Sequence, residues 1–241
     1  QMLADQAKNL LAYKRETVPL VERFRGTHSG ERWVGGSNIP GEYLLPQKLG
    51  AFIKKHPGIR PILRIGDSAS VVEDLLEGKV ELGVVGFKGD ETRLRFEKVW
   101  EDEMILAVPK GHPWSGRKSI QLKDLRTEKF ISRERGSGTL ESFRHLLSTS
   151  RQSVDELLNI SMELGSTEAI KQAIVAGCGI SILSRISISH ELADGRLVEV
   201  SIRGITMERD FYQVYHARRP LHPNAQAFRE FLKQPNLNRK S

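Results

Sequence analysis

The sequence has few of the residues that mark metal, redox or secreted proteins. Cys178 is the one cysteine among 241 residues, so no internal disulfide can form, which fits a reducing, cytoplasmic compartment. The seven histidines lack the clustered spacing of metal ligands, and neither a Gly-x-Ser-x-Gly elbow nor a dinucleotide-binding G-x-G-x-x-G occurs. We therefore predict no catalytic residue, no metal site and no cofactor.

Long apolar runs are also missing. None approaches the ~18 residues of a membrane span, and no basic start precedes an apolar core, so we expect neither a membrane partner nor a secretory signal. Because the chain begins at Gln1 rather than Met, we expect a fragment or a processed product. Hydrophobic residues at 39% and charged residues at 28% are typical of a globular protein, and the length suits two lobes of roughly 100 residues each.

Cysteine and charge each leave a choice of interpretation. Cys178 lies in an apolar, glycine-rich stretch, which predicts a buried structural thiol rather than a redox sensor in a basic, exposed setting.

The net charge is +7, and the surplus of basic residues lies near the end of the chain, between Arg203 and Lys240. This distribution predicts either a solvated surface or a contact with DNA or another partner.

The first 25 residues differ from the rest. Apolar side chains recur there near helical spacing, from Leu3 to Phe24, and Pro19 should bend or end the helix. A helix with one apolar stripe must bury it. We favour a partner helix from a second subunit, and the alternative is packing on the chain's own globular part.

Strands and helices then alternate in two series. The first has strands over 32–35, 60–65 and 82–85 with helices over 42–56 and 68–76. Separate strands are expected over 94–100 and 104–108. The second series has strands over 130–132, 160–164 and 179–183 with helices over 139–147 and 167–176, followed by strands over 197–200 and 209–216 and a closing helix over 224–232. The pattern predicts two α/β lobes built on parallel strands.

Four strand-to-helix loops carry glycine beside serine or threonine, namely Gly35–Gly41, Gly66–Ser68, Ser132–Thr139 and Gly165–Glu168. In open parallel sheets ligands bind at the carboxyl ends of strands, where helix N-termini favour anions. Ordinary helix capping requires the same residue types and is the alternative at each loop. Ser132–Thr139 is the richest, because Arg135 or Arg133 offers a guanidinium fork for an oxyanion.

Five features of the sequence occur together: GGSNIPGEYLLP at 35–46, Phe52 with His56-Pro57, Leu75 and Gly78 with ELG at 81–83, MILAVPKGHP at 104–113 and AGCGISIL at 176–183. In these features the chain resembles the effector-binding domain of LysR-type transcriptional regulators. The resemblance covers roughly Glu31 to Leu232, and the segment before it resembles the end of the family's linker helix. The Arg135–Thr139 stretch most resembles the sulfur- and selenium-metabolism branch.

The resemblance implies two Rossmann-like lobes of the type 2 periplasmic-binding-protein architecture, hinged by two crossover strands. Residues 1–27 would end the linker helix, 31–107 plus 214–241 would form lobe I, 108–204 lobe II and 205–213 the return crossover. A small anionic effector, either a sulfur or selenium oxyanion or a small carboxylate, would bind between the lobes. Its expected contacts are Ser37, Asn38, Ile39, Ser68, Arg135, Ser137, Thr139, Ser166 and Thr167.

The resemblance also implies a homodimer or tetramer whose DNA contact belongs to a winged helix-turn-helix that this sequence lacks. A solute-binding protein of a transporter, which shares the two-lobed architecture, is the alternative function. An enzyme on this fold is the third possibility, and it lacks a convincing nucleophile or metal set.

Overall fold

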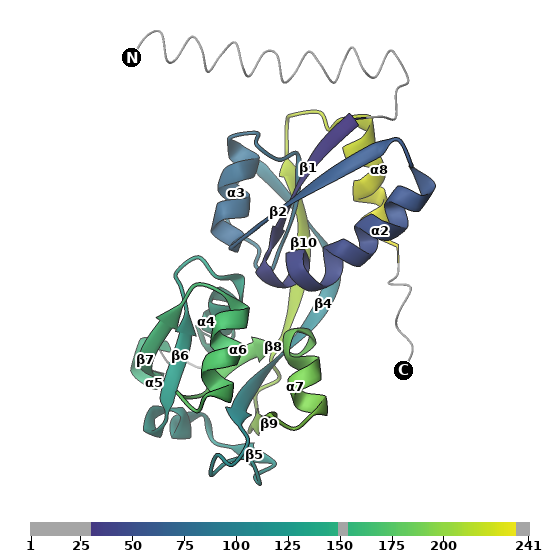
Figure 1. The fold of residues 1–241 in the computed structure, drawn as a ribbon. Helices are drawn as coiled ribbons and strands as arrows, with labels where there is room; N and C mark the ends of the chain where they lie inside the picture. Colours follow the sequence, from purple (N-terminus) through teal and green to yellow (C-terminus); the bar gives the residue numbers. More distant parts are fainter. Residues whose placement is uncertain (1–29, 149–153, 235–241) are drawn as a thin grey trace.

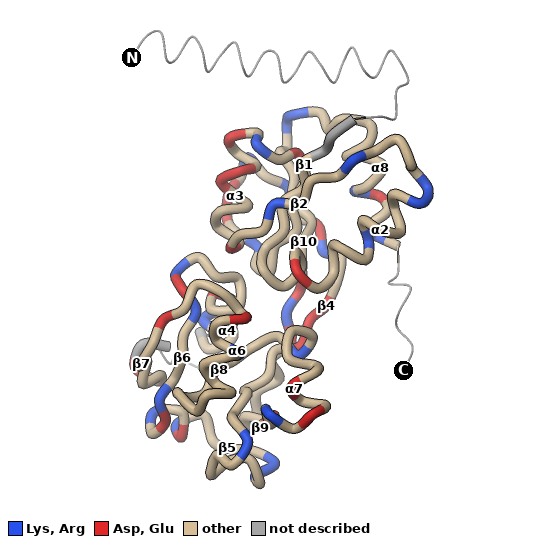
Figure 2. The backbone as a smooth tube through the Cα atoms, in the orientation of Figure 1, with Lys and Arg blue, Asp and Glu red and all other residues tan. Residues whose placement is uncertain are grey.

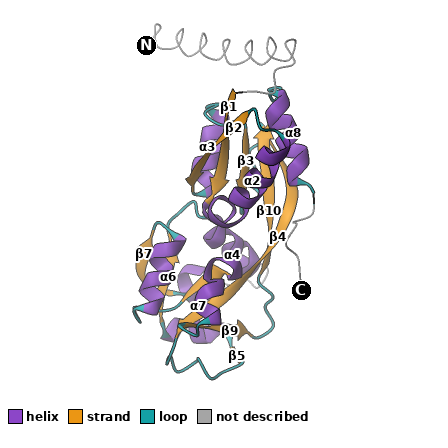
Figure 3. Cartoon of the chain, turned by 45° about the vertical axis from the view of Figure 1, so that its right-hand side comes forward, coloured by secondary structure: helices purple, strands orange, loops and turns teal. Residues whose placement is uncertain are grey.

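The computed structural model describes residues 30–148 and 154–234 (Figure 1). The predicted linker helix over residues 1–27 therefore lies outside the described residues. Two α/β lobes stand one above the other and are joined by long strands (Figures 1 and 3).

The upper lobe, lobe I, is built on strands in the order β2-β1-β3-β10-β4. β1 pairs in parallel with β2 and β3, and β10 runs antiparallel to β3 and β4. Its elements are β1 (Gly30–Ser37), a π-helical turn (Pro40–Leu44), α2 (Leu45–Lys55), β2 (Ile59–Gly66), α3 (Ser68–Leu76), β3 (Leu82–Val85), β10 (Glu208–His216) and α8 (Pro223–Leu232), with the first part of β4 (Leu94–Pro109).

The lower lobe, lobe II, continues from the same long strand. The second part of β4 pairs antiparallel with β8 and β9, and β6 pairs in parallel with β7. Its other elements are β5 (Ser119–Ile120), a 3-10 helix (Leu122–Thr127), β6 (Lys129–Arg133), α4 (Gly138–Ser148), α5 (Val154–Leu157), β7 (Asn159–Leu164), α6 (Thr167–Val175), β8 (Ser181–Ser184), a 3-10 helix (Arg185–Ile188), α7 (Ser189–Ala193) and β9 (Leu197–Ile202).

One prediction about the strands was wrong. The stretches 94–100 and 104–108 form a single strand, β4, that changes partner from β10 at Glu103 to β8 at Met104. The polar residues between the two stretches suggested a break in the sequence. In the structure Asp102 is buried, because it pairs with charged and hydroxyl groups on two other elements.

The helix predicted over 42–56 begins differently from the expectation. Its first turn is a π-helix, in which the N–H of Leu45 donates to the carbonyl of Pro40 five residues earlier. Pro46 follows in the first turn of α2, where its missing N–H costs nothing, so the regular α-helix can start only there.

The prediction of a buried Cys178 was also wrong, since the thiol is exposed. Gly177 ends α6 with φ of 76°, and its N–H donates to Ile174 while the N–H of Cys178 donates to Ala173. This is a Schellman-type helix end, which places the residue after the glycine on the outside of the turn.

Separate apolar clusters fill the two lobes. In lobe I, Phe52 of α2 meets Phe228 and Phe231 of α8 at ring-centroid distances of 5.0 and 5.5 Å. Glu97 of β4 adds a polar anchor for α8, because it accepts hydrogen bonds from Tyr215 (2.6 Å) and Arg229 (2.9 Å).

A first prediction concerns Gly179, which lies directly on the backbone of β6. A Cβ there would collide with the carbonyl oxygen of Lys129, which already accepts a hydrogen bond from Ile180. Gly179→Ala should therefore lower the free energy of unfolding by about 1–3 kcal/mol in urea denaturation. Gly116→Ala is the control, because no atom lies within 4 Å of its added Cβ. Equal stability of both variants would contradict this contact.

A second prediction concerns pH and Glu97. Burial raises the pKa of Glu97, but hydrogen bonds from Tyr215, Gln213 and Arg229 outweigh it and lower the pKa from 4.5 to about 2. A carboxyl with a depressed folded-state pKa stabilises the fold above its unfolded pKa, and this stability is lost as the pH falls from about 4.5 to about 2.

Glu97→Gln should thus cost about 1–3 kcal/mol at pH 7 and flatten the stability profile below pH ~4.5. Urea melts at several pH values would measure both effects. Glu101→Gln, on the exposed face of the same strand and paired with Lys98 at 2.9 Å, should change stability by less than about 1 kcal/mol. An unchanged pH slope in Glu97→Gln would refute the assignment.

Candidate functional site

A small cavity lies where the two lobes meet, and both lobes and one crossover strand line it. The space among its lining atoms, which includes space open to solvent, amounts to about 220 Å³. The part that can hold the centre of a water molecule is about 10 Å³, so the cavity is narrow. The lining residues are Ser37, Asn38, Ile39, Pro40, Asp67, Ser68 and Gly86 from lobe I, Arg133, Ser137, Gly138 and Thr139 from lobe II, and Arg209 and Phe211 from β10.

The structure brings six of the nine predicted ligand contacts together around this cavity. They come from three loops that the sequence separates by up to 102 positions, as counted from Ser37 to Thr139. The six are Ser37, Asn38, Ile39, Ser68, Ser137 and Thr139.

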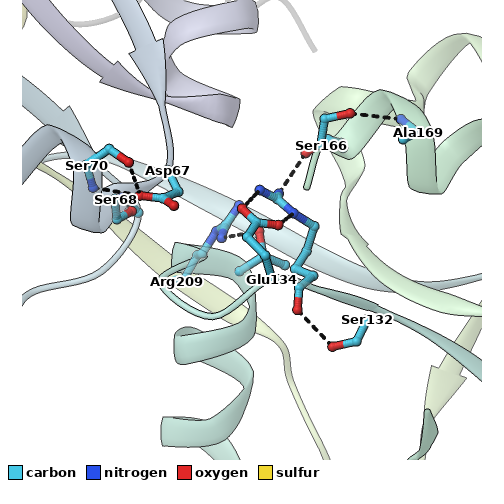
Figure 4. Close-up of polar contacts among 12 residues, drawn as sticks. Asp67, Ser68, Ser70, Ser132, Glu134, Ser166, Ala169 and Arg209 are labelled. Atoms are coloured by element: carbon cyan, nitrogen blue, oxygen red, sulfur yellow. Dashed lines mark hydrogen bonds and ion pairs between the residues drawn. The ribbon is translucent and has the colours of Figure 1, made fainter. Parts of the chain in front are cut away.

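The other three predicted residues do not line the cavity. Arg135 is exposed in the turn before α4. Ser166 caps α6 by accepting a hydrogen bond from the N–H of Ala169 at 3.1 Å (Figure 4). Thr167 is buried behind the cavity and accepts a hydrogen bond from Nη1 of Arg133 at 3.1 Å. The Gly165–Glu168 loop therefore caps helix α6, which was the alternative to ligand binding at this loop.

Arg133, rather than Arg135, presents its guanidinium to the cavity. Its side chain is only 3% exposed. Nε and Nη2 donate to the two carboxylate oxygens of Glu134 at 2.7 and 2.6 Å, in the parallel geometry of a bidentate pair (Figure 4). With the Asn38 amide oriented to satisfy both its groups, its oxygen also accepts from Nη2 of Arg133 at 2.5 Å. Arg133 thus links lobe II to the first loop of lobe I.

A second buried arginine joins the two crossover strands behind the cavity. Arg209 of β10 donates through Nε to Asp102 of β4 at 2.8 Å and through Nη1 to Thr139 of α4 at 2.9 Å. Asp102 also accepts from Ser184 of β8 at 2.6 Å. Burial lowers the pKa of Arg209, and the adjacent Asp102 carboxylate opposes that shift. The Asp102 carboxylate therefore serves as the counter-ion of this buried guanidinium.

Hydroxyl groups and glycines complete the cavity wall. Ser137 is 1% exposed, and among the described residues its Oγ has no hydrogen-bond partner. Gly138 lets the lobes approach, because a Cβ there would lie 2.6 Å from Oγ of Ser68 and 3.2 Å from the backbone of Gly86. A buried hydroxyl without a partner is costly, and a bound polar ligand would relieve that cost.

Sequence reasoning missed Arg209 and its partner Asp102. Both lie in strands with polar neighbours on either side, so nothing in the local pattern distinguishes them from exposed charges. The sequence leaves Arg133 and Arg135 as alternatives, and strand alternation does not separate them, because both positions have the same parity as Ile131. The end of β6 at Arg133 decides between them, because Arg135 then falls in the exposed turn.

Lys or Arg positions and Asp or Glu positions are interspersed along the backbone of both lobes (Figure 2). Within residues 30–148 and 154–234, no three His, Cys, Asp or Glu side chains are placed to hold a metal ion. In the same part of the chain no helix has the length and apolarity needed to cross a membrane.

Fold and cavity together define a two-lobed ligand-binding domain. Residues 25–235 match the LysR substrate binding domain family, and the chain belongs to that family. It is 34% identical over 191 residues to the RuBisCO operon transcriptional regulator of Acidithiobacillus ferrooxidans, covering 79% of this chain and 60% of that protein. It is 29% identical to the transcriptional activator CmpR of Synechocystis, covering 96% of this chain and 75% of that one. By their names these relatives regulate transcription.

Solved structures agree with this fold. The regulatory domain of CcmR from Synechocystis, solved in complex with 2-PG, superimposes with a TM-score of 0.76 at 29% identity, over 85% of this chain and 96% of that one. OxyR of Corynebacterium glutamicum aligns with a TM-score of 0.75 at 17% identity, over 96% of this chain and 72% of that one, which shows the fold alone. The predicted α/β, periplasmic-binding-protein-like architecture is confirmed.

The Asp102–Arg209 pair yields a third prediction. Asp102→Asn keeps the shape of the side chain but leaves the Arg209 charge buried without a counter-ion, so we expect a loss of about 3 kcal/mol in the free energy of unfolding. Chemical denaturation would measure it. Glu103→Gln is a matched control one residue along β4, where the 52% exposed carboxylate pairs with Arg185, and should cost less than about 1 kcal/mol. Similar losses in both variants would show that Asp102 carries no special role.

Proposed function

We propose that this chain is the ligand-sensing domain of a bacterial DNA-binding transcription factor and that it binds a small anionic effector in the cavity between its lobes. The observation that carries the proposal is the convergence of two buried guanidinium groups, Arg133 and Arg209, with hydroxyls from both lobes. Guanidinium forks and hydroxyl donors suit carboxylates and tetrahedral oxyanions. We assign the effector contact to Arg133 in place of Arg135, because Arg135 is exposed outside the cavity.

Binding would act on the arrangement of the lobes. We propose lobe I as 31–107 plus 214–241, lobe II as 108–204 and a return crossover over 205–213. Arg209 on one crossover strand contacts Asp102 on the other, so a ligand that touches Arg209 bears directly on the strands that connect the lobes. Preferential binding to one lobe arrangement would shift the population toward it.

The proposal also concerns the chemical class of the effector. The CcmR domain, at 29% identity, is described with 2-PG, and we propose that an anion of similar size fits here. The sulfur or selenium branch remains a proposal, supported by 30% identity to the regulator CysL of Bacillus subtilis over 96% of this chain. RuBisCO operon regulators are matched at 30–34% identity, so they support a different metabolic branch equally well.

The assembly is likewise proposed. We infer a cytoplasmic homodimer or tetramer, in which a winged helix-turn-helix elsewhere in a longer protein contacts DNA. The chain spans 60% of the length of the Acidithiobacillus relative and 75% of CmpR, which leaves room for such a segment in a full-length protein. The names of these relatives favour this function over a transporter's solute-binding protein.

A thermal-shift screen tests the anion site. The purified chain would be melted with sulfate, sulfite, thiosulfate, selenite, phosphate, O-acetylserine, simple carboxylates and 2-PG. A ligand at 100 times its Kd should stabilise the fold by about 2.7 kcal/mol and raise the melting temperature by roughly 5–10 °C. We expect at least one anion to do so in a dose-dependent way.

Two neighbouring arginines supply the control. Arg133→Ala should abolish the shift, whereas Arg135→Ala should retain it, because only Arg133 lines the cavity. A shift lost in Arg135→Ala and kept in Arg133→Ala would overturn our assignment of the contact. No shift with any anion in the unmodified chain would overturn the anionic-effector proposal.

A further inference from the structure

The edge of the Arg133 guanidinium formed by Nε and Nη2 has no N–H group left to donate to a ligand. Nε and Nη2 both donate to Glu134, Nη2 also faces the amide oxygen of Asn38, and Nη1 donates to Thr167. An anion that enters the cavity therefore cannot contact Nε and Nη2 of Arg133 together while Glu134 stays in place.

The balance of charges around the cavity also disfavours an incoming anion. Arg133 is paired with Glu134, and Arg209 with Asp102. Asp67 also lines the cavity and adds a further carboxylate. With two positive groups against three negative ones, the cavity with its counter-ions has no surplus of positive charge to attract an anion.

One of the two counter-ions is far easier to release than the other. The Asp102 side chain is 5% exposed, and a hydrogen bond from Ser184 at 2.6 Å holds it in place. The Glu134 side chain is 23% exposed and stands at the start of the turn that contains Gly136, whose φ is 93°. Rotation of Glu134 into solvent restores the hydration of its carboxylate and frees Nε and Nη2 of Arg133 for an incoming anion, whereas Asp102 is too buried for its carboxylate to be hydrated by such a rotation.

We propose that the Glu134 carboxylate occupies the position on Arg133 where the effector's oxyanion binds, and that the oxyanion displaces it. This inference rests on the proposed function. The ligand class is then an oxyanion that presents two oxygens to Nε and Nη2, as a carboxylate, sulfate or phosphate group does. A second polar group on the ligand would meet the buried Oγ of Ser137, which has no hydrogen-bond partner among the described residues.

This arrangement makes Glu134 a specificity-determining residue. A neutral polar molecule cannot replace a carboxylate on a buried guanidinium, because it leaves the charge uncompensated. Glu134 is tethered beside Arg133, so an anion can bind only in those molecules in which Glu134 has moved away. The apparent affinity for any anion is therefore lowered in proportion to the fraction of molecules in which Arg133 is free.

Isothermal titration of the whole chain with sulfate and with 2-PG tests the proposal. Glu134→Gln removes the competing charge while retaining the side-chain shape, so Kd for at least one of these probes should fall by about tenfold or more. Glu141→Gln is the matched control. It removes the same charge a short distance along the chain, in a side chain that pairs with Arg144 at 3.0 Å and does not line the cavity. Its Kd should stay within about twofold of the unmodified value.

If Glu134→Gln does not fold well, Glu134→Asp offers the same test. The shorter side chain keeps its charge but cannot reach both Nε and Nη2, so Kd should fall by a smaller factor. The melting temperature of either variant without ligand should drop, and saturating probe should restore more of it than in the unmodified chain.

Each result decides between distinct conclusions. Weaker binding in Glu134→Gln would mean that Glu134 contacts the ligand itself, and unchanged binding would mean that Glu134 does not compete. Either outcome overturns this inference while leaving the anion site intact. Failure of both probes to bind any form of the chain would overturn this inference together with the proposed site for these anions.

Discussion

The ion pair between Arg209 and Asp102 is the interaction on which the geometry between the lobes depends. It joins the two crossover strands where β4 leaves lobe I and enters lobe II, and Ser184 and Thr139 extend it into lobe II. Two charges removed from water cost several kcal/mol each, and only close pairing with further hydrogen bonds offsets that cost. The main effect of the pair is therefore to fix the relative position of the two strands, and its net contribution to the free energy of folding is secondary.

The cavity lies where backbone and charged groups of the two lobes meet, and Ile39, Pro40 and Phe211 form the apolar part of its wall. Gly138 allows the start of α4 to approach the Ser68 side chain and the backbone of Gly86, so the two lobes touch there. The guanidinium of Arg133 lies beside this contact and reaches the first loop of lobe I. A narrow space lined by residues of both lobes lies between these contacts.

In the proposed site, sensing and structure would use the same residues. Thr139 lines the cavity and accepts a hydrogen bond from Arg209, so a ligand bound near it would perturb the network that spans both crossover strands. Each arginine has a carboxylate partner, so neither buried positive charge is left uncompensated. Under the proposal, the effector's oxyanion replaces the carboxylate on Arg133, so the buried charge stays compensated.

The sequence alone determined the alternation of strands and helices and the loops at the carboxyl ends of strands, because these follow from short-range periodicity and capping chemistry. The six predicted residues that line the cavity came from the resemblance to the family. Tertiary structure decided which arginine faces the cavity, that β4 is one strand and that Cys178 is exposed. Arg209 and Asp102 are 107 positions apart. Local patterns cannot pair residues at that separation, since the burial that makes their charges matter arises only when the chain returns to form β10 beside β4.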